Sequence, residues 1–145
     1  MTTGCAFCSG AGGALLWRDG RCRVVLTDEP FVGFCRVIWN AHVREMTDLS
    51  AADRAHCMDV AYAVESALRA RLAPTKVNLA SLGNVTPHLH WHVIPRFADD
   101  THFPGPVWAP PLRAAPARAL PPGFVDAVAR DLAAALGPGE GGTPR

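Results

Sequence analysis

The chain has 145 residues, of which 49% are hydrophobic and 19% charged, as expected for one globular domain. A net charge of +1 excludes the strongly basic surface that nucleic-acid-binding proteins carry. No apolar run approaches the roughly 20 residues needed to cross a bilayer, and the first residues lack the features of a secretory signal. We therefore expect a cytoplasmic protein that binds neither nucleic acid nor membrane.

Three short strands are predicted in the N-terminal part of the chain. The first two, Ala14 to Trp17 and Arg21 to Leu26, are joined at Asp19-Gly20, a dipeptide that favours a tight turn. The third covers Phe34 to Trp39. These lengths are typical of strands in an antiparallel sheet.

A long helix is predicted next. Ser50 and Asp53 have the spacing of a helix N-terminal cap. Apolar residues then recur at helical spacing until Pro74, namely Met58, Ala61, Val64, Leu68 and Leu72. This pattern predicts one amphipathic helix that packs on the sheet.

Two more strands complete the predicted sheet. They cover Lys76 to Leu82 and His88 to Pro95, with a turn over Gly83 to Pro87 between them. The predicted fold class is α+β, with a mainly antiparallel five-stranded sheet packed by one long helix. We assign residues 1–97 to this domain.

The remainder of the chain is rich in proline. Seven prolines between residues 104 and 122 disfavour regular structure, so we expect residues 98–136 to form an extension with one short helix over Phe124 to Leu136. Residues 137–145 are predicted to be a disordered tail.

The predicted strand from residue 88 to residue 95 contains the residues most suited to catalysis. Alternate side chains of a strand face opposite sides, so His88, His90 and His92 share one side. Imidazoles about 7 Å apart along a strand suit a groove for an extended polyphosphate, and a neutral imidazole nitrogen is a competent nucleophile. A metal site that uses the same histidines is the alternative.

The segment His88-Leu89-His90-Trp91-His92-Val93-Ile94 resembles the signature of the histidine triad (HIT) superfamily of nucleotide hydrolases and transferases. The resemblance extends from Cys5 to about Arg96. It implies a HIT-like fold, a homodimer and cleavage at the α-phosphate through a covalent nucleotidyl-histidine intermediate. The implied substrate is a purine nucleotide or nucleotide conjugate, with dinucleoside polyphosphate hydrolysis the first candidate, and no organic cofactor is implied.

The resemblance also implies a role for each histidine. His90 attacks the α-phosphate, His92 contacts the phosphates, and His88 steadies the site or ligates a metal. All three are therefore candidate catalytic residues.

Four further residues stand at positions of the family that bind substrate. Gly83 and Asn84 match a pair that approaches the phosphates, and Asn78 stands near a phosphate-contacting asparagine. Asp28 occupies the place of the acidic residue that binds the ribose hydroxyls.

Three features depart from the family pattern. Val85 followed by Thr86 replaces the serine or threonine that many members carry directly after the position of Asn84, and Phe34 replaces a histidine. The third departure is the Pro-rich extension, which could close over the groove or join a dimer contact.

Cys5 and Cys8 form a CxxC pair that can be read as a redox pair, as free thiols or as part of a zinc site. The resemblance to bacterial HIT proteins implies a structural zinc held by Cys5, Cys8, His42 and His88, at a site removed from the nucleophile. The other cysteines lie in apolar stretches and are predicted to be buried, namely Cys22, Cys35 and Cys57.

Two other functions remain open from the sequence. One is a zinc-stabilised nucleotide-binding protein with little turnover. The other is a metallohydrolase that uses the histidine row as its ligands.

Overall fold

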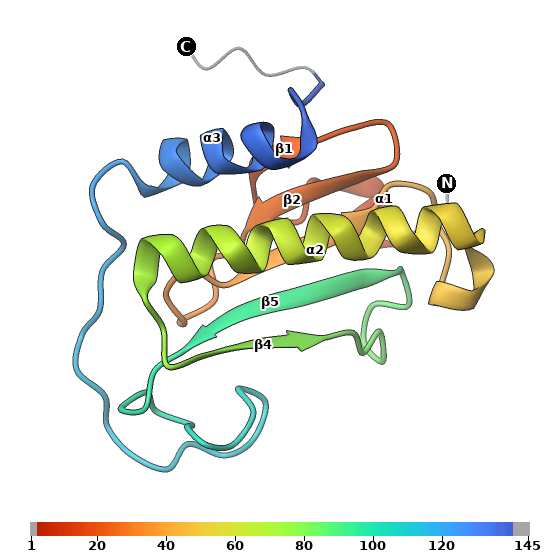
Figure 1. The fold of residues 1–145 in the computed structure, drawn as a ribbon. Coiled ribbons are helices and arrows are strands. Elements are labelled where there is room, and N and C mark those ends of the chain that lie inside the picture. The colour runs from red at the N-terminus through yellow and green to blue at the C-terminus, as the bar shows by residue number, and fades with distance from the viewer. Residues whose placement is uncertain (1–2, 141–145) are drawn as a thin grey trace.

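The computed structural model describes residues 3–140, and its centre is one sheet with a long helix lying across it (Figure 1). The strands are β1 (Ala14–Arg18), β2 (Cys22–Leu26), β3 (Cys35–Trp39), β4 (Lys76–Ala80) and β5 (His90–Arg96). All neighbouring strands are antiparallel, in the order β1-β2-β3-β5-β4. The predicted five-stranded antiparallel sheet is confirmed.

The helix α2 (Ala51–Leu72) begins and ends where the sequence predicts. The Ser50 hydroxyl accepts a hydrogen bond from the Asp53 backbone N–H at 3.1 Å, which caps the first turn. The helix ends as Ala73 adopts a left-handed conformation (φ 46°) ahead of Pro74.

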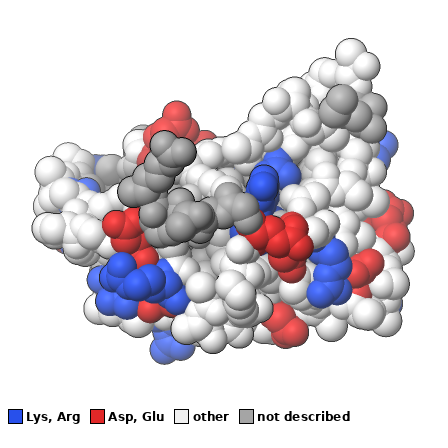
Figure 2. All heavy atoms as spheres, turned by 90° about the horizontal axis from the view of Figure 1, so that it is seen from above, with Lys and Arg blue, Asp and Glu red and all other residues white. Residues whose placement is uncertain are grey.

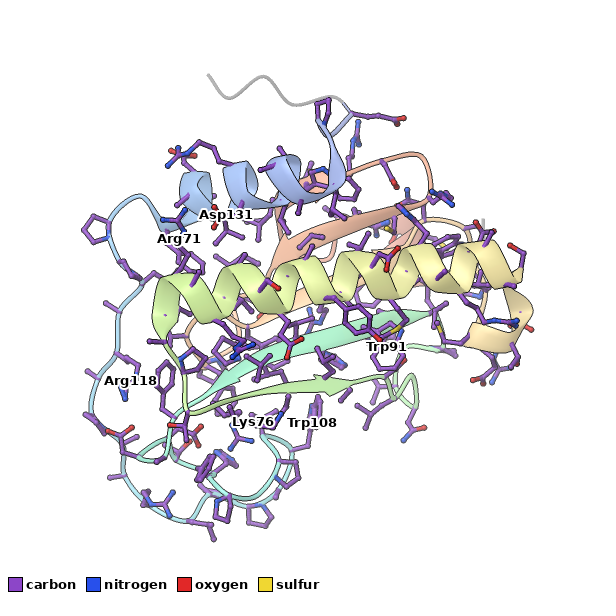
Figure 3. The ribbon with its side chains drawn as sticks, in the orientation of Figure 1. Arg71, Lys76, Trp91, Trp108, Arg118 and Asp131 are labelled. Atoms are coloured by element: carbon purple, nitrogen blue, oxygen red, sulfur yellow. The ribbon has the colours of Figure 1, made fainter. Side chains whose placement is uncertain are left out.

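The helix α3 (Phe124–Leu136) has the predicted bounds and packs on α2 and β1. Arg71 of α2 donates two hydrogen bonds, of 2.8 and 2.7 Å, to the carboxylate of Asp131 of α3 (Figure 3). Two short elements were not predicted, α1 (Ala6–Ser9) and the 3₁₀ helix η1 (Met46–Asp48). Both are too short to give a periodic pattern.

The two faces of the sheet are covered differently. One face, here called the helix face, packs its apolar side chains against α2 and α3, including Val37, Leu89 and Val93. The opposite face carries His90, His92 and their cross-strand neighbours, and is here called the histidine face. The predicted segregation of histidines from Leu89, Trp91 and Val93 is confirmed for His90 and His92, whereas His88 lies outside the strand.

The first strand residue of β5 is His90, so the predicted start at His88 is wrong. The Leu89 N–H donates to the carbonyl of Val43, outside the sheet, and the His88 ring is held at the carbonyl of Trp39. These contacts pull the chain out of strand geometry before His90. Strand β4 likewise ends at Ala80, two residues earlier than predicted.

An N-terminal arm crosses the histidine face. The guanidinium of Arg23, from β2, donates to the carbonyls of Phe7, Gly10 and Ala11 at 2.7 to 3.1 Å. Since buried or partly buried carbonyls need donors, Arg23 fixes the arm against the sheet.

The segment after β5 passes below β4 and returns to α3 without forming a helix or strand over residues 97–123 (Figure 1). Residues 137–140, included in the predicted disordered tail, hydrogen bond to β1. The Trp17 indole donates to the carbonyl of Gly137 at 3.0 Å, and the Glu140 N–H donates to the backbone carbonyl of Arg18 at 2.8 Å. The rest of the predicted tail, residues 141–145, lies outside the described residues.

Arg96, at the end of β5, organises the start of this segment. Its buried guanidinium donates to both carboxylate oxygens of Asp100 and to the carbonyl of Gly105. Burial acts to raise the pKa of Asp100, but bonds from Arg96 and from backbone N–H groups lower it well below its usual range. The carboxylate is therefore stabilised in its charged form by the folded state.

Replacing Asp100 with asparagine should lower the free energy of unfolding by about 2 kcal/mol at pH 7, because Arg96 loses its charged partner. A depressed folded-state pKa contributes stability above the unfolded pKa of about 3.9, and this contribution is lost as pH falls. The difference between wild type and Asp100→Asn should thus shrink below about pH 4. Urea unfolding at several pH values measures this difference in unfolding free energy. The matched control is Asp99→Asn, which removes an exposed carboxylate paired with Arg118.

The face of the molecule shown in Figure 2 has no concentrated basic patch among its described residues. In Figure 2 the basic and acidic side chains are interspersed over the face shown. Among residues 3–140, no helix has the length and apolar character needed to span a bilayer.

Candidate active site and metal centre

Four side chains from distant parts of the chain converge beside the start of β5. Cys5 and Cys8 come from the N-terminal arm, His42 follows β3, and His88 precedes β5. Their ligand atoms all lie within 4.8 Å of one another. The structure therefore brings together all four residues of the predicted metal site.

The distances within this cluster fit a tetrahedral metal ion. Tetrahedral zinc separates sulfur and nitrogen ligands by about 3.6 Å and two nitrogen ligands by roughly 3.3 Å. The His88 Nδ1 atom lies 3.4 Å from Cys5 Sγ, 3.6 Å from Cys8 Sγ and 3.2 Å from His42 Nδ1. Cys8 Sγ lies 3.4 Å from His42 Nδ1. The cluster can hold a metal ion.

The protonation of His88 also suits a ligand. Its Nε2 lies 2.6 Å from the Trp39 carbonyl, which can only accept, so Nε2 carries the proton and Nδ1 presents a lone pair to the cluster. Burial acts to raise the pKa of Cys5, but hydrogen bonds from Cys8 and Phe7 lower it overall. This favours the thiolate that metals bind.

The remaining cysteines are buried as predicted. Their thiol pKa values are raised, whereas that of Cys5 is lowered. Burial raises the pKa of Cys35 to about 12 and that of Cys57 to about 11, and it also raises that of Cys22. These three thiols are therefore unreactive core residues.

The four-residue cluster lies next to His90, the predicted nucleophile, and is not removed from it as the sequence led us to expect. The His90 Nδ1–H donates to the backbone carbonyl of His88 at 2.6 Å. A residue of the candidate metal cluster, His88, therefore supplies the carbonyl that orients His90. The reason is the chain path, since His88 turns toward the cysteines while its carbonyl still points along the histidine face.

His90 has the features of a positioned nucleophile. Because the His88 carbonyl only accepts, Nδ1 of His90 carries the proton and Nε2 keeps a lone pair. Burial is the main cause that lowers the pKa of His90, which keeps the ring neutral near pH 7. Phe7 contacts it edge-on, with ring centroids 4.9 Å apart.

His90 lines a hollow of about 270 Å³. Its lining also includes residues 44–47, residues 81–83, His88 and Leu89. Gly83 therefore lines the same hollow as His90. Asn84 lies on the same loop and is exposed, as is Val85.

His92 does not line this hollow, although its ring centroid lies 4.8 Å from that of His90. Its side chain is 7% exposed and its ring is flanked by Phe34 and Trp108, with centroids 5.5 and 5.0 Å away. Burial lowers the pKa of His92 to about 4. The expectation of one open groove along three histidines is wrong, because His88 turns to the metal cluster and aromatic rings cover His92.

Two other predicted substrate residues are placed as follows. Asn78 shares the histidine face, and its side-chain oxygen accepts a hydrogen bond from Arg96 at 2.8 Å. Asp28 is exposed in the connection between β2 and β3. The structure does not bring Asp28 into contact with the histidines.

Two residues of the site were missed from the sequence. Arg36 projects on the histidine face opposite His92, and Trp108 covers His92 from the Pro-rich segment, beyond β4 in Figure 3. A charged residue within an apolar strand was the available signal for Arg36. No local pattern points to Trp108.

Comparisons with known proteins agree with this geometry. The HIT domain family model matches residues 12–99. The structure resembles a histidine triad protein from Bradyrhizobium japonicum (23% identity, TM-score 0.68, covering 84% of this chain and 92% of that one). It also resembles one from Sinorhizobium meliloti (25% identity, TM-score 0.65, covering 87% and 91%).

A third structure, from Sulfolobus tokodaii, is described as a hypothetical histidine triad nucleotide-binding protein (18% identity, TM-score 0.61, covering 90% and 91%). No protein with a curated description matches this chain significantly. The fold and site define a histidine triad protein. Since the family model matches more than half of its length, the chain belongs to the HIT domain family.

Proposed function

We propose that this chain is a nucleotide hydrolase or nucleotidyl transferase that cleaves its substrate at the α-phosphate, with His90 as the nucleophile. The observation that carries the proposal is the hydrogen bond from His90 Nδ1–H to the His88 carbonyl, which leaves Nε2 unprotonated. Attack of Nε2 on the α-phosphorus forms a nucleotidyl-histidine and expels the leaving group. Water or another acceptor then takes the nucleotidyl group.

The proposed substrate is a purine nucleotide joined to a phosphate, an amine or a second nucleotide. The S. tokodaii relative is described as nucleotide-binding, which supports this class. Gly83 contributes a backbone able to approach a phosphate closely, since it has a positive φ of 78° and no crowding side chain. A homodimer belongs to the same proposal.

The metal in the proposed function is a structural zinc bound by Cys5, Cys8, His42 and His88. The ligand distances support zinc, and when bound it would stabilise the fold at this cluster. No step of the reaction is assigned to it. The chain's own contribution is to hold the His88 carbonyl against His90.

The alternative metallohydrolase has less support. Within residues 3–140, neither group of potential metal ligands includes His90 or His92. Loss of activity on chelation with the fold intact would favour it. A nucleotide-binding protein without turnover remains the second candidate, and release of nucleoside monophosphate separates it from an enzyme.

The proposed substrate class, purine nucleotides, is tested by calorimetric titration with adenosine and guanosine monophosphates. We expect binding of at least one at millimolar concentration or below, because His90 and Gly83 line a small hollow and the Gly83 backbone can approach a phosphate. Release of monophosphate from diadenosine tetraphosphate is then followed by chromatography. Binding without release identifies the second candidate, and absence of binding by both nucleotides contradicts the proposal.

A further inference from the structure

Cys5 and Cys8 form a pair of neighbouring thiols within one helical turn. Cys5 is the residue before α1 and Cys8 is the third residue of α1, and their sulfur atoms belong to a cluster whose ligand atoms all lie within 4.8 Å of one another. A disulfide requires the two sulfur atoms to approach to about 2.05 Å. Because only two residues separate the cysteines, a local movement of α1 can close this distance.

The two thiols differ in their access to solvent. Cys8 is half-buried, whereas Cys5 is buried. Arg23 donates to the carbonyls of Phe7 and Gly10, which flank Cys8 in the sequence, so a permanent cation lies beside the pair. A partly exposed thiol beside a cation is the usual setting of an oxidation-sensitive cysteine. A small oxidant therefore reaches Cys8 first, and Cys5 is placed to form the disulfide with it.

The other three cysteines lack this access. Cys22 and Cys35 are completely buried, and Cys57 is 1% exposed. All three belong to the main hydrophobic core on the helix face of the sheet. Because such interiors are closely packed, a polar oxidant reaches these thiols only when the core opens. They provide an internal reference for the oxidation of the pair.

The thiol pair contacts the groups that position His90. Phe7, which lies between the two cysteines in the sequence, packs edge-on against the rings of His88 and His90, with centroids 5.8 and 4.9 Å away. The His88 Nδ1 atom lies 3.4 and 3.6 Å from the two sulfur atoms, and the His88 carbonyl accepts the hydrogen bond from His90. A disulfide would shift α1 and with it both Phe7 and His88. Oxidation of the pair would therefore change two contacts of the proposed nucleophile.

We propose that Cys5 and Cys8 are a site of reversible oxidation, at which a hydroperoxide closes a disulfide and lowers the activity of His90. The effect on activity rests on the proposed function, whereas the disulfide itself does not. A disulfide supplies no thiolate ligand, so the cluster would keep only His42 and His88, too few protein ligands for a structural zinc site. Oxidation should therefore also release a bound metal ion.

The reaction consumes one peroxide for each disulfide. The sulfur of Cys8 attacks one oxygen of hydrogen peroxide, the O–O bond breaks, and a sulfenic acid and water form. The sulfur of Cys5 then attacks the sulfenic sulfur, the S–S bond forms, and the hydroxyl group leaves as water with the second thiol proton. Two electrons pass from the two sulfur atoms to the peroxide oxygens. Dithiothreitol reverses the change by thiol–disulfide exchange.

The site is tested by peptide mapping of the wild-type protein during treatment with hydrogen peroxide. Samples are unfolded, their free thiols are alkylated, and the protein is digested with trypsin. Cys5 and Cys8 then share the peptide that ends at Arg18, while each core cysteine lies in a separate peptide. We expect the shared peptide to lose both alkylation sites at least about tenfold faster than any core peptide loses its own. Equal rates, or two free thiols in the shared peptide throughout, would overturn the inference.

The link to His90 is measured in the same samples. Release of nucleoside monophosphate should fall at least about tenfold as the disulfide forms, as expected for a displaced nucleophile. Zinc-loaded protein should release its zinc in step with the disulfide, and dithiothreitol with added zinc should restore the activity. If the disulfide forms and the activity is unchanged, the link to His90 is wrong while the proposed function stands. If no monophosphate is released before treatment, the proposed function fails, and the peptide map still decides the oxidation site.

Two variants complete the test, each compared with its own activity before treatment. Cys8→Ser removes one sulfur atom, so no disulfide forms and peroxide should change its remaining activity by less than about twofold. Cys57→Ala keeps both thiols of the pair and should respond as the wild type does. If Cys8→Ser loses activity to peroxide as the wild type does, another residue is the target and the inference is wrong. If Cys8→Ser does not fold, the wild-type peptide map decides.

Discussion

Replacing His90 with asparagine is expected to abolish turnover, by a factor of about 10⁴ or more, while nucleotide binding remains largely intact. The asparagine amide can still donate to the His88 carbonyl, so the local hydrogen bond is conserved. An amide nitrogen has no available lone pair and cannot form the covalent intermediate. Steady-state release of nucleoside monophosphate and titration with AMP measure the two quantities separately.

The same prediction is tested directly by trapping the intermediate. Rapid acid quench of wild type with substrate, followed by mass spectrometry, should find a nucleoside monophosphate adduct on the peptide that contains His90. His92→Asn should keep the adduct and lose only about 10- to 100-fold in rate, because it removes a positioning group. An adduct on another residue, or near-native turnover by His90→Asn, contradicts the mechanism.

Loss of the metal cluster is expected to have the largest effect on stability. Protein purified without added metal should contain about one zinc per chain, since four ligands at tetrahedral distances form one site. Cys5→Ser should lower the metal content and reduce the unfolding temperature by more than about 10 °C, because zinc binding free energy is coupled to folding. Elemental analysis and thermal melts with and without a chelator measure both.

A cysteine outside the cluster provides the control. Cys57→Ala removes a buried thiol of α2 and should keep the full metal content. Since His88 is both a cluster ligand and the acceptor for His90, loss of the metal should also slow catalysis, but less than it reduces stability. A metal content near zero in a stable wild-type protein would show that the thiols are free.

The sequence by itself determined the elements of this fold, because their signals are local. The Ser50 cap, the apolar spacing up to Leu72 and the following Pro74 defined α2 within one stretch of chain. Alternation along β5 separated His90 and His92 from the apolar residues of the helix face. The four residues of the cluster could be named from the family resemblance, because the CxxC pair and two histidines stand at matching positions.

The tertiary structure decided how these residues are used, because contacts between distant segments leave no periodic trace. Cys5 and His88 are 83 residues apart, and their contact turns His88 away from the histidine row and its carbonyl toward His90. The pairing of β3 with β5 sets Arg36 opposite His92. Trp108 contacts His92 from a segment without regular structure, whose start is held by the bonds between Arg96 and Asp100, and no local pattern points to that contact.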